Sequence, residues 1–287
     1  NLLNRMKKPT TTLKKNVSLI PAKRVFVILM ATICCLTLLN LAAFQINQLT
    51  IDNYWFNESI ESLVRLLNTN GEANIPSWYS SSALLAASAL LFLITALKAR
   101  ASDSYLLHWK FMAIIFLYLS LDETAVIHEM LSKPLQALLH TDGLLFYPWV
   151  LVAGGCLVLL FIMYAKFLLH LPNNIRLLFI VSGIIFVFGA IIVESFQAYK
   201  DSLGKNSRAD FIVPTTIEEF LEMTGIALFI YTLMQYINEH LLSPQSTPNL
   251  QLDVPVRLDT VSVDRAAEFK ETSMTRNVDE QPCPPNS

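Results

Sequence analysis

Six apolar segments, each about as long as a bilayer is thick, constrain this chain more than any other feature of its sequence. A helix rises ~1.5 Å per residue, so about 20 apolar residues cross the ~30 Å hydrocarbon core of a membrane. The segments that meet this test are 25–46, 79–97, 106–127, 146–169, 175–193 and 211–237. Only 15% of the residues are charged, against about 25% in soluble domains. We therefore predict an all-α polytopic membrane protein, a bundle of six transmembrane helices.

Polar segments flank this region at both ends. Residues 1–24 are rich in Lys and Arg, and residues 241–287 consist largely of Pro, Ser, Thr, Gln and scattered charges. The second segment lacks the apolar surface that folding requires, which predicts a disordered tail. We expect a basic leader at 1–24, a membrane domain at 25–240 and a tail at 241–287. A cleaved signal peptide is the alternative for the first span, but about 24 residues precede it, which favours an uncleaved helix.

The distribution of Lys and Arg predicts the orientation of the chain. The basic leader places the N-terminus on the cytoplasmic side, and the basic turns near residues 100 and 170 return to that side. The loop at 47–78 has one Arg against four acids and is expected outside. The loop at 200–210 has both signs and fits least well. We expect a multipass inner (plasma) membrane protein with both termini in the cytoplasm.

The segment 57–67 has a helical pattern outside the spans. Apolar residues at 60, 63, 64 and 67 have the spacing of one helix face. Such a helix either lies along the outer membrane surface or packs on the mouth of the bundle, and both alternatives stay open.

Carboxylates near the outer ends of three spans form the candidate site. The third span rises about 24 Å before it reaches its first acid, the fifth ends at an acid, and the sixth has three acids in its first turns. The predicted outward and inward directions bring all of these to the outer leaflet. The candidate residues are Asp122, Glu123, His128, Glu129, Glu194, Glu218, Glu219 and Glu222.

Helical geometry limits which of these residues can face one another. Asp122 and Glu129 are seven apart and share a face, whereas Glu123 and His128 are five apart and point about 140° away from each other on a regular helix. A ligand set from this helix therefore consists of Asp122 with Glu129, or of Glu123 with a partner from another helix.

Three interpretations of the cluster remain open, because carboxylates cannot all stay ionised in a membrane without cations. A divalent metal is one, since acid-rich bundles with histidine suit Mn, Fe, Zn or Ca, although the Glu-x-x-His spacing of di-iron bundles is absent. A proton-titrating site is the second. In the third, the acids are structural: they bond between helices, pair with Lys200, Lys205 and Arg208, or cap a helix that starts at Thr215 or Thr216.

Other histidines and glycines on the spans have simpler interpretations. The histidines near the cytoplasmic ends are expected to be interfacial, and the glycines are expected to allow close helix approach. These residues are His108, His170, His240, Gly154, Gly155, Gly183 and Gly189.

Several short sequence motifs resemble those of a family of uncharacterised bacterial multipass inner-membrane proteins. They are Leu119-Ser120-Leu121-Asp122-Glu123, Ile127-His128-Glu129 and Glu218-Glu219-Phe220-Leu221-Glu222-Met223-Thr224-Gly225, with Glu194 between them. The resemblance covers spans three to six and implies a bacterial origin. It implies no activity.

The sequence supports three hypotheses about function. The first is a membrane protein with a metal site at the outer leaflet, where, in an enzyme, the metal would activate water or a lipid-linked group beside a Glu base. The second is a proton- or cation-coupled transporter, although no inverted repeat is visible. The third is a non-catalytic subunit with protein partners in a larger membrane complex. The lipid bilayer is the expected partner in every case, and no nucleic acid is.

Overall fold

The computed structural model describes residues 21–48, 54–69, 71, 73–204 and 207–242. Most of the predicted leader and nearly all of the predicted tail lie outside these residues. Every regular element in the described part of the chain is a helix. This confirms the all-α prediction.

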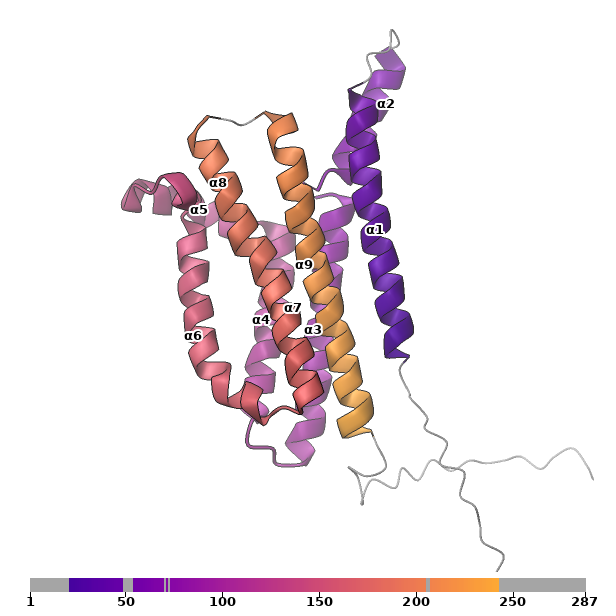
Figure 1. Ribbon diagram of the computed structural model, residues 1–287, viewed down its shortest axis with the longest axis vertical. Coiled ribbons are helices and arrows are strands. Elements are labelled where there is room, and N and C mark those ends of the chain that lie inside the picture. Colours follow the sequence, from indigo (N-terminus) through magenta and orange to yellow (C-terminus); the bar gives the residue numbers. More distant parts are fainter. Residues whose placement is uncertain (1–20, 49–53, 70, 72, 205–206, 243–287) are drawn as a thin grey trace, which may run out of the picture. The chain divides into compact units, whose positions relative to one another are not determined.

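Six long helical rods run alternately up and down (Figure 1). They are α1 (Ala22–Asn47), α3 (Ile75–Arg100), α4 (Leu106–Ala125), α6 (Trp149–His170), the continuous run α7 (Asn173–Val187), η2 (Phe188–Val193) and α8 (Glu194–Ser202), and α9 (Arg208–Tyr236) followed by η3 (Ile237–Leu241). Five are long and apolar enough to cross a membrane, and a sixth qualifies when α4 is joined to α5 (Ile127–Leu139). The chain thus has the helices of a multipass membrane protein.

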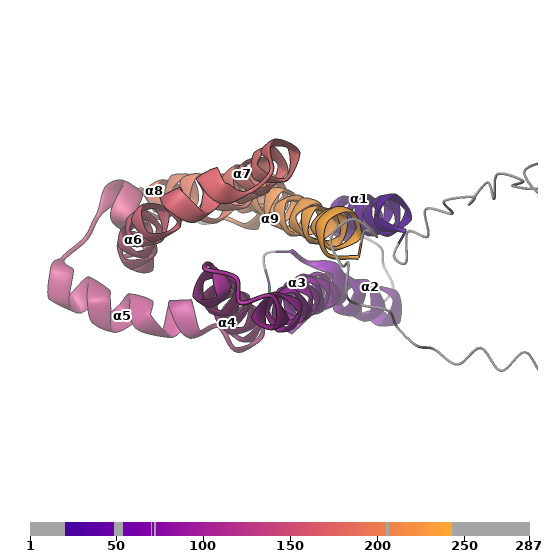
Figure 2. The same cartoon turned by 90° about the horizontal axis from the view of Figure 1, so that it is seen from below.

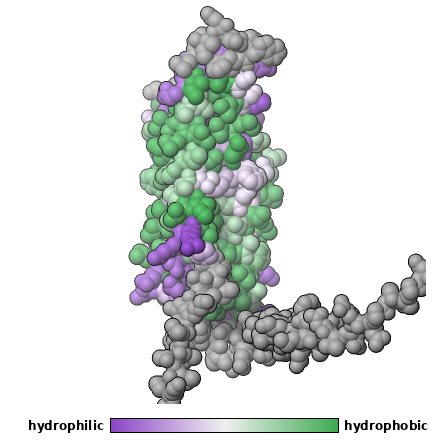
Figure 3. All heavy atoms as spheres, turned by 90° about the vertical axis from the view of Figure 1, so that its right-hand side faces the viewer, coloured by the Kyte–Doolittle hydropathy of each residue, from purple (hydrophilic) through white to green (hydrophobic). Residues whose placement is uncertain are grey.

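The surface of the rods is apolar. Leu159, Phe161 and Ile162 on α6 are mostly exposed, as are many large apolar side chains on the other rods. Figure 3 shows one face, on which hydrophobic residues cover the middle between more hydrophilic patches toward the ends. Soluble proteins rarely expose contiguous apolar surface of this extent, which agrees with helices long and apolar enough to cross a membrane.

The rods form two layers (Figure 2). One layer contains α6, α7–α8, α9 and α1, and the other contains α4 and α3. The largest group of buried side chains joins the layers through α3, α4, α6, α7 and α9, and includes Leu91, Trp109, Phe167, Leu233 and Ile237. This apolar core occupies the end of the bundle where α3 turns into α4. The opposite end is left for polar groups.

Two glycines let α9 approach α7 and η2 closely. A Cβ added at Gly225 would lie 2.8 Å from the backbone nitrogen of Phe186, and one at Gly189 would lie 3.0 Å from the carbonyl oxygen of Glu218. Only glycine leaves room for backbones this close. A Cβ at Gly154, Gly155 or Gly183 would meet nothing within 4 Å, so close packing explains Gly189 but not these three.

The short helix α2 (Tyr54–Leu67) packs against α1. Val64 and Leu67 are buried with Ala43 of α1, which favours packing on the mouth of the bundle for this segment. Just beyond α2, Thr69 Oγ1 accepts a hydrogen bond of 3.0 Å from the buried Asn40 side chain, which also donates 3.0 Å to Thr216 Oγ1 of α9. The buried Asn40 amide therefore links α1 to the segment after α2 and to α9.

The predicted third span breaks near its end. Val126 adopts a left-handed conformation (φ 57°, ψ 40°), and α5 leaves α4 at an angle of 79°. A β-branched residue is rarely found there, so contacts nearby must hold the bend. The predicted fifth span is also longer than 175–193, because its helix continues to Ser202.

Candidate functional site

The predicted acids meet at one end of the bundle, where α4 ends and α8 and α9 face each other (Figure 1). Glu219 and Glu222 of α9 lie within charge–charge range of Glu123 on α4 and Glu194 on α8. Glu218 lies within the same range of Glu194. The structure thus brings five of the eight predicted residues together from three helices.

Glu218 is the most enclosed carboxyl of this cluster, with only 6% of its surface exposed. The Gln197 side-chain amide donates to Glu218 Oε2, while the Gln197 carbonyl accepts from Thr215 Oγ1 at 2.7 Å. The Glu194 carboxyl lies close enough to Glu218 to interact with it electrostatically. Two ionised carboxylates this close repel each other, so the pair favours a proton or a cation in its neighbourhood.

The π-helical turn η2 positions Glu194 for this contact. A π turn adds a residue to the helix and rotates the residues after it, and such turns often occur at functional sites. Glu194 is the first residue after η2, and Gly189 within η2 packs against the α9 backbone at Glu218. The π turn and the glycine together place Glu194 beside the part of α9 that carries Glu218.

Helix α9 begins earlier than the sequence predicted. Its N-cap is Ser207, whose hydroxyl accepts from the Asp210 amide, so Thr215 and Thr216 lie inside the helix and do not cap it. Pro214 lacks an N–H and leaves the Asp210 carbonyl without its helical donor. The Lys200 ammonium donates to that carbonyl instead.

The predicted ion pairs with basic residues are not found in the described part of the cluster. The ion pairs among described residues are Lys98–Asp103, His128–Asp122 and His240–Glu239. None of them involves Glu218, Glu219 or Glu222. Lys200 bonds the Asp210 carbonyl, and the side chains of Lys205 and Arg208 lie outside the described residues.

Asp122 and His128 form a second group at the bend between α4 and α5. Asp122 accepts from the His128 backbone N–H at 2.9 Å and lies 2.9 Å from the ring Nδ1. These contacts hold the left-handed turn at Val126. The spacing argument that put Asp122 and Glu129 on one face assumed an unbroken helix, whereas the helix breaks at Val126 between them. The break leaves Glu129 exposed.

Trp149 of α6 connects the two groups. Its ring centroid lies 4.7 Å from that of His128, and its indole N–H donates to Glu194 Oε1 at 3.3 Å. The sequence analysis singled out neither Trp149 nor Gln197. Gln197 stands three residues after Glu194, a spacing that puts both on one face once the helix continues beyond 193.

No group of three or more His, Cys, Asp or Glu side chains among the described residues is arranged to hold a metal ion. The eight predicted metal ligands divide into the glutamate cluster, the Asp122–His128 pair and the exposed Glu129. The metal interpretation remains a prediction.

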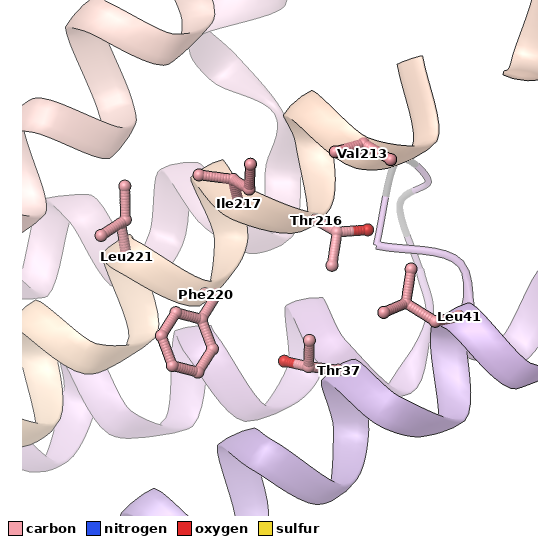
Figure 4. Close-up of a pocket in the computed structure, with 7 residues that line it drawn as sticks. All are labelled: Thr37, Leu41, Val213, Thr216, Ile217, Phe220 and Leu221. Atoms are coloured by element: carbon pink, nitrogen blue, oxygen red, sulfur yellow. The ribbon is translucent and has the colours of Figure 1, made fainter. Parts of the chain in front are cut away.

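An apolar groove of about 400 Å³ lies on another side of α9, against α1 (Figure 4). Its two threonines, Thr37 and Thr216, donate to carbonyls of their own helices. The rest of its lining is apolar, namely Leu41, Val213, Ile217, Phe220 and Leu221. This groove contains none of the predicted site residues.

A separate polar group occupies the turn between α3 and α4, at the other end of the bundle. Burial alone would raise the pKa of Asp103, but hydrogen bonds from Lys98 and from the Tyr105 backbone, with the charges of Lys98 and His170, outweigh it. The pKa of Asp103 therefore lies below its ordinary value. The ring of Tyr105 lies against both His108 and His170, as expected for interfacial residues.

A family model matches residues 25–236, a range that includes most of each of the six rods and every residue of the glutamate cluster. The chain belongs to the family described as a domain of unknown function, DUF8692. No curated protein and no solved structure matches the chain. Membership agrees with the resemblance to an uncharacterised family, and the DUF8692 match brings no activity with it.

The chemistry available to this DUF8692 protein is that of carboxyls held together in an apolar bundle. A buried carboxylate without a cation is costly, so the charge is neutralised by a proton or by a bound cation. Glu219 and Glu222 are partly buried, and Glu218 is buried.

Proposed function

We propose that this DUF8692 protein crosses the bacterial inner membrane six times, with both termini in the cytoplasm. In this arrangement α4 crosses alone, and α5 follows outside the hydrocarbon core. The end of the bundle opposite the acids carries Lys98, Arg100, Lys166 and Arg176. An excess of Lys and Arg marks the cytoplasmic side of membrane proteins, which supports this orientation.

Labelling of single cysteines tests the orientation. Ser102 lies in the turn after α3 and Ser202 ends α8, at opposite ends of the bundle. In a variant whose native cysteines are replaced by serine, a membrane-impermeant maleimide added to intact cells should label Ser202→Cys and spare Ser102→Cys. The reverse pattern would refute the orientation.

We infer that the glutamate cluster binds and releases a proton, or a small cation in its place, as part of a coupled transport cycle. The observation that carries this inference is the Glu218 carboxyl, which is buried, accepts a hydrogen bond from the Gln197 amide, lies near Glu194, and is in no ion pair within the described residues. Ionisable residues inside membrane bundles are costly, and they commonly mark ion pathways and proton relays.

The contact between Glu194 and Glu218 favours this function over a purely structural role. A structural carboxylate is stable when donors or cations match it, whereas two facing carboxyls repel each other once their shared proton leaves. The close approach of Glu194 and Glu218 therefore depends on occupancy by a positive charge. Such dependence is what a carrier site requires, because loading and unloading then change the contact between α8 and α9.

Flux measurements in liposomes test the proposal. Wild-type protein is reconstituted with an internal pH dye, and a pH gradient or a gradient of Na⁺, K⁺, Mg²⁺ or Ca²⁺ is imposed. We expect wild-type flux, at least a tenfold loss in Glu218→Gln, and retention in Glu129→Gln, which changes an exposed acid at the same end. Equal flux in wild-type and empty liposomes would contradict transport. Partners that co-purify in fixed ratio would then favour the subunit hypothesis.

A further inference from the structure

Helix α5 is not packed into the bundle. None of its residues is buried. Met130 and Leu138 are 72% and 75% exposed, and Leu131 and Leu139 are also exposed. The contacts that tie α5 to the protein come from its polar residues: His128 to Asp122, and the Gln136 amide to the carbonyl of Phe146 at 3.4 Å. Ile127 and Leu135 are partly buried, whereas Met130, Leu131, Leu138 and Leu139 are exposed.

The apolar residues of α5 form one face. Positions 127, 131, 134, 135 and 138 follow the i, i+4, i+7, i+8, i+11 spacing of a helix stripe, and all are apolar. The other side carries Glu129, Ser132, Lys133 and Gln136. Amphipathic helices of this kind lie in the plane of a membrane interface with the apolar face in lipid.

The preceding span places α5 at that depth. Helix α4 has 20 residues, which at ~1.5 Å each span about 30 Å, the thickness of the hydrocarbon core. The bend of 79° then turns α5 nearly parallel to the membrane plane. Tyr147 and Trp149 follow α5 in the chain, and such aromatic residues concentrate at the interface.

We propose that α5 is a membrane-interface helix whose apolar face rests in the lipid of the outer leaflet. The proposal rests on the six-span topology proposed for this chain. The occupant is lipid because the exposed face adjoins the apolar surface of the spans at the point where the chain leaves the hydrocarbon core. The Asp122–His128 pair fixes the bend, so it sets the angle at which α5 meets the membrane beside the glutamate cluster.

Spin-label accessibility in the full chain tests this proposal. Nitroxides are attached at single cysteines replacing Leu131 and Leu138 on the apolar face, and Glu129 and Lys133 on the polar face, in protein reconstituted in lipid vesicles. We expect relaxation by apolar oxygen to exceed relaxation by a water-soluble nickel chelate at 131 and 138, with the reverse at 129 and 133.

Two outcomes would overturn the proposal. If the nickel chelate relaxes the labels at 131 and 138 more than oxygen does, the apolar face lies in water. If neither oxygen nor the nickel chelate reaches these labels, the face lies against protein, such as a second copy of this chain. A label at Leu159, exposed in the middle of α6, is the reference. If Leu159 also shows nickel access, the membrane topology itself is wrong. If Leu159 shows oxygen access, the failure belongs to α5 alone.

Discussion

Replacing Gly225 by alanine tests whether the contact between α7 and α9 is as close as the structure places it. The new Cβ would lie 2.8 Å from both the backbone nitrogen and the Cβ of Phe186, and 2.9 Å from its Cα. Carbon atoms in good contact are about 3.5–4.0 Å apart. Backbone atoms cannot rotate aside, so the two helices must separate.

The expected magnitude combines two opposing effects. Overpacking of this kind costs about 1–3 kcal/mol, whereas alanine gains about 0.8–1 kcal/mol over glycine in a helix. We expect Gly225→Ala to lose up to about 2 kcal/mol of unfolding free energy, and to be about 1–3 kcal/mol less stable than an alanine placed where a helix glycine has room. The matched control is Gly183→Ala on α7, where a Cβ meets nothing within 4 Å, and this variant should be neutral or up to about 1 kcal/mol more stable.

The assay is reversible unfolding in mixed micelles, followed by far-ultraviolet circular dichroism at increasing SDS. Separation of α7 from α9 would also part Glu194 from Glu218, so Gly225→Ala should lose flux in liposomes as well. If Gly225→Ala proves as stable as Gly183→Ala, the close contact between these helices is refuted.

Three further predictions concern the bend, the buried amide and the α3–α4 turn. Asp122→Ala removes the contacts that fix α5 and should cost about 1–2 kcal/mol locally. We expect faster amide hydrogen exchange across α5, with exchange in α3 unchanged. Exchange in α5 as slow as in the wild type would contradict this. Asn40→Leu deletes a buried amide with two side-chain partners and should lower the unfolding free energy by about 1–3 kcal/mol, measured in the same micelle assay; no loss would show that the amide is dispensable. The ion pair of Asp103 with Lys98 should contribute about 0.2–1 kcal/mol, measured as the stability difference between wild type and Asp103→Asn across pH. The pKa of Asp103 is lowered in the folded protein, so the full stability difference should be present above the unfolded-state pKa of about 3.9. The difference should disappear as pH falls through the folded-state pKa. A stability difference that grows as pH falls would refute this prediction.

The sequence predicts the parts of this structure that depend on length and apolarity. The six rods follow from runs of about 20 apolar residues. The position of the acids at one end follows from helical rise and alternating direction. Hence Glu194, Glu218, Glu219 and Glu222 can be placed at the same end of the bundle from the sequence, but their convergence depends on which helices are neighbours.

The sequence could not predict features that depend on tertiary contacts. Nothing at Val126 marks a break, since neither Gly nor Pro stands there, and the turn is held by Asp122 bonding forward to His128. The π turn η2 and the resulting contact of Glu194 with Glu218 depend on packing against α9. Thr215 and Thr216 have the pattern of a helix start, but the Lys200 contact with the carbonyl freed by proline lets α9 begin earlier.

The most direct test of the central claim is the infrared spectrum of the protein in lipid vesicles, recorded in H₂O and D₂O for wild type, Glu218→Gln and Glu129→Gln. A proton shared by Glu194 and Glu218 predicts a carboxylic-acid C=O band that shifts on deuteration, disappears in Glu218→Gln and persists in Glu129→Gln. A wild-type spectrum without this band, or a band that Glu218→Gln leaves unchanged, would contradict a proton held between these two residues.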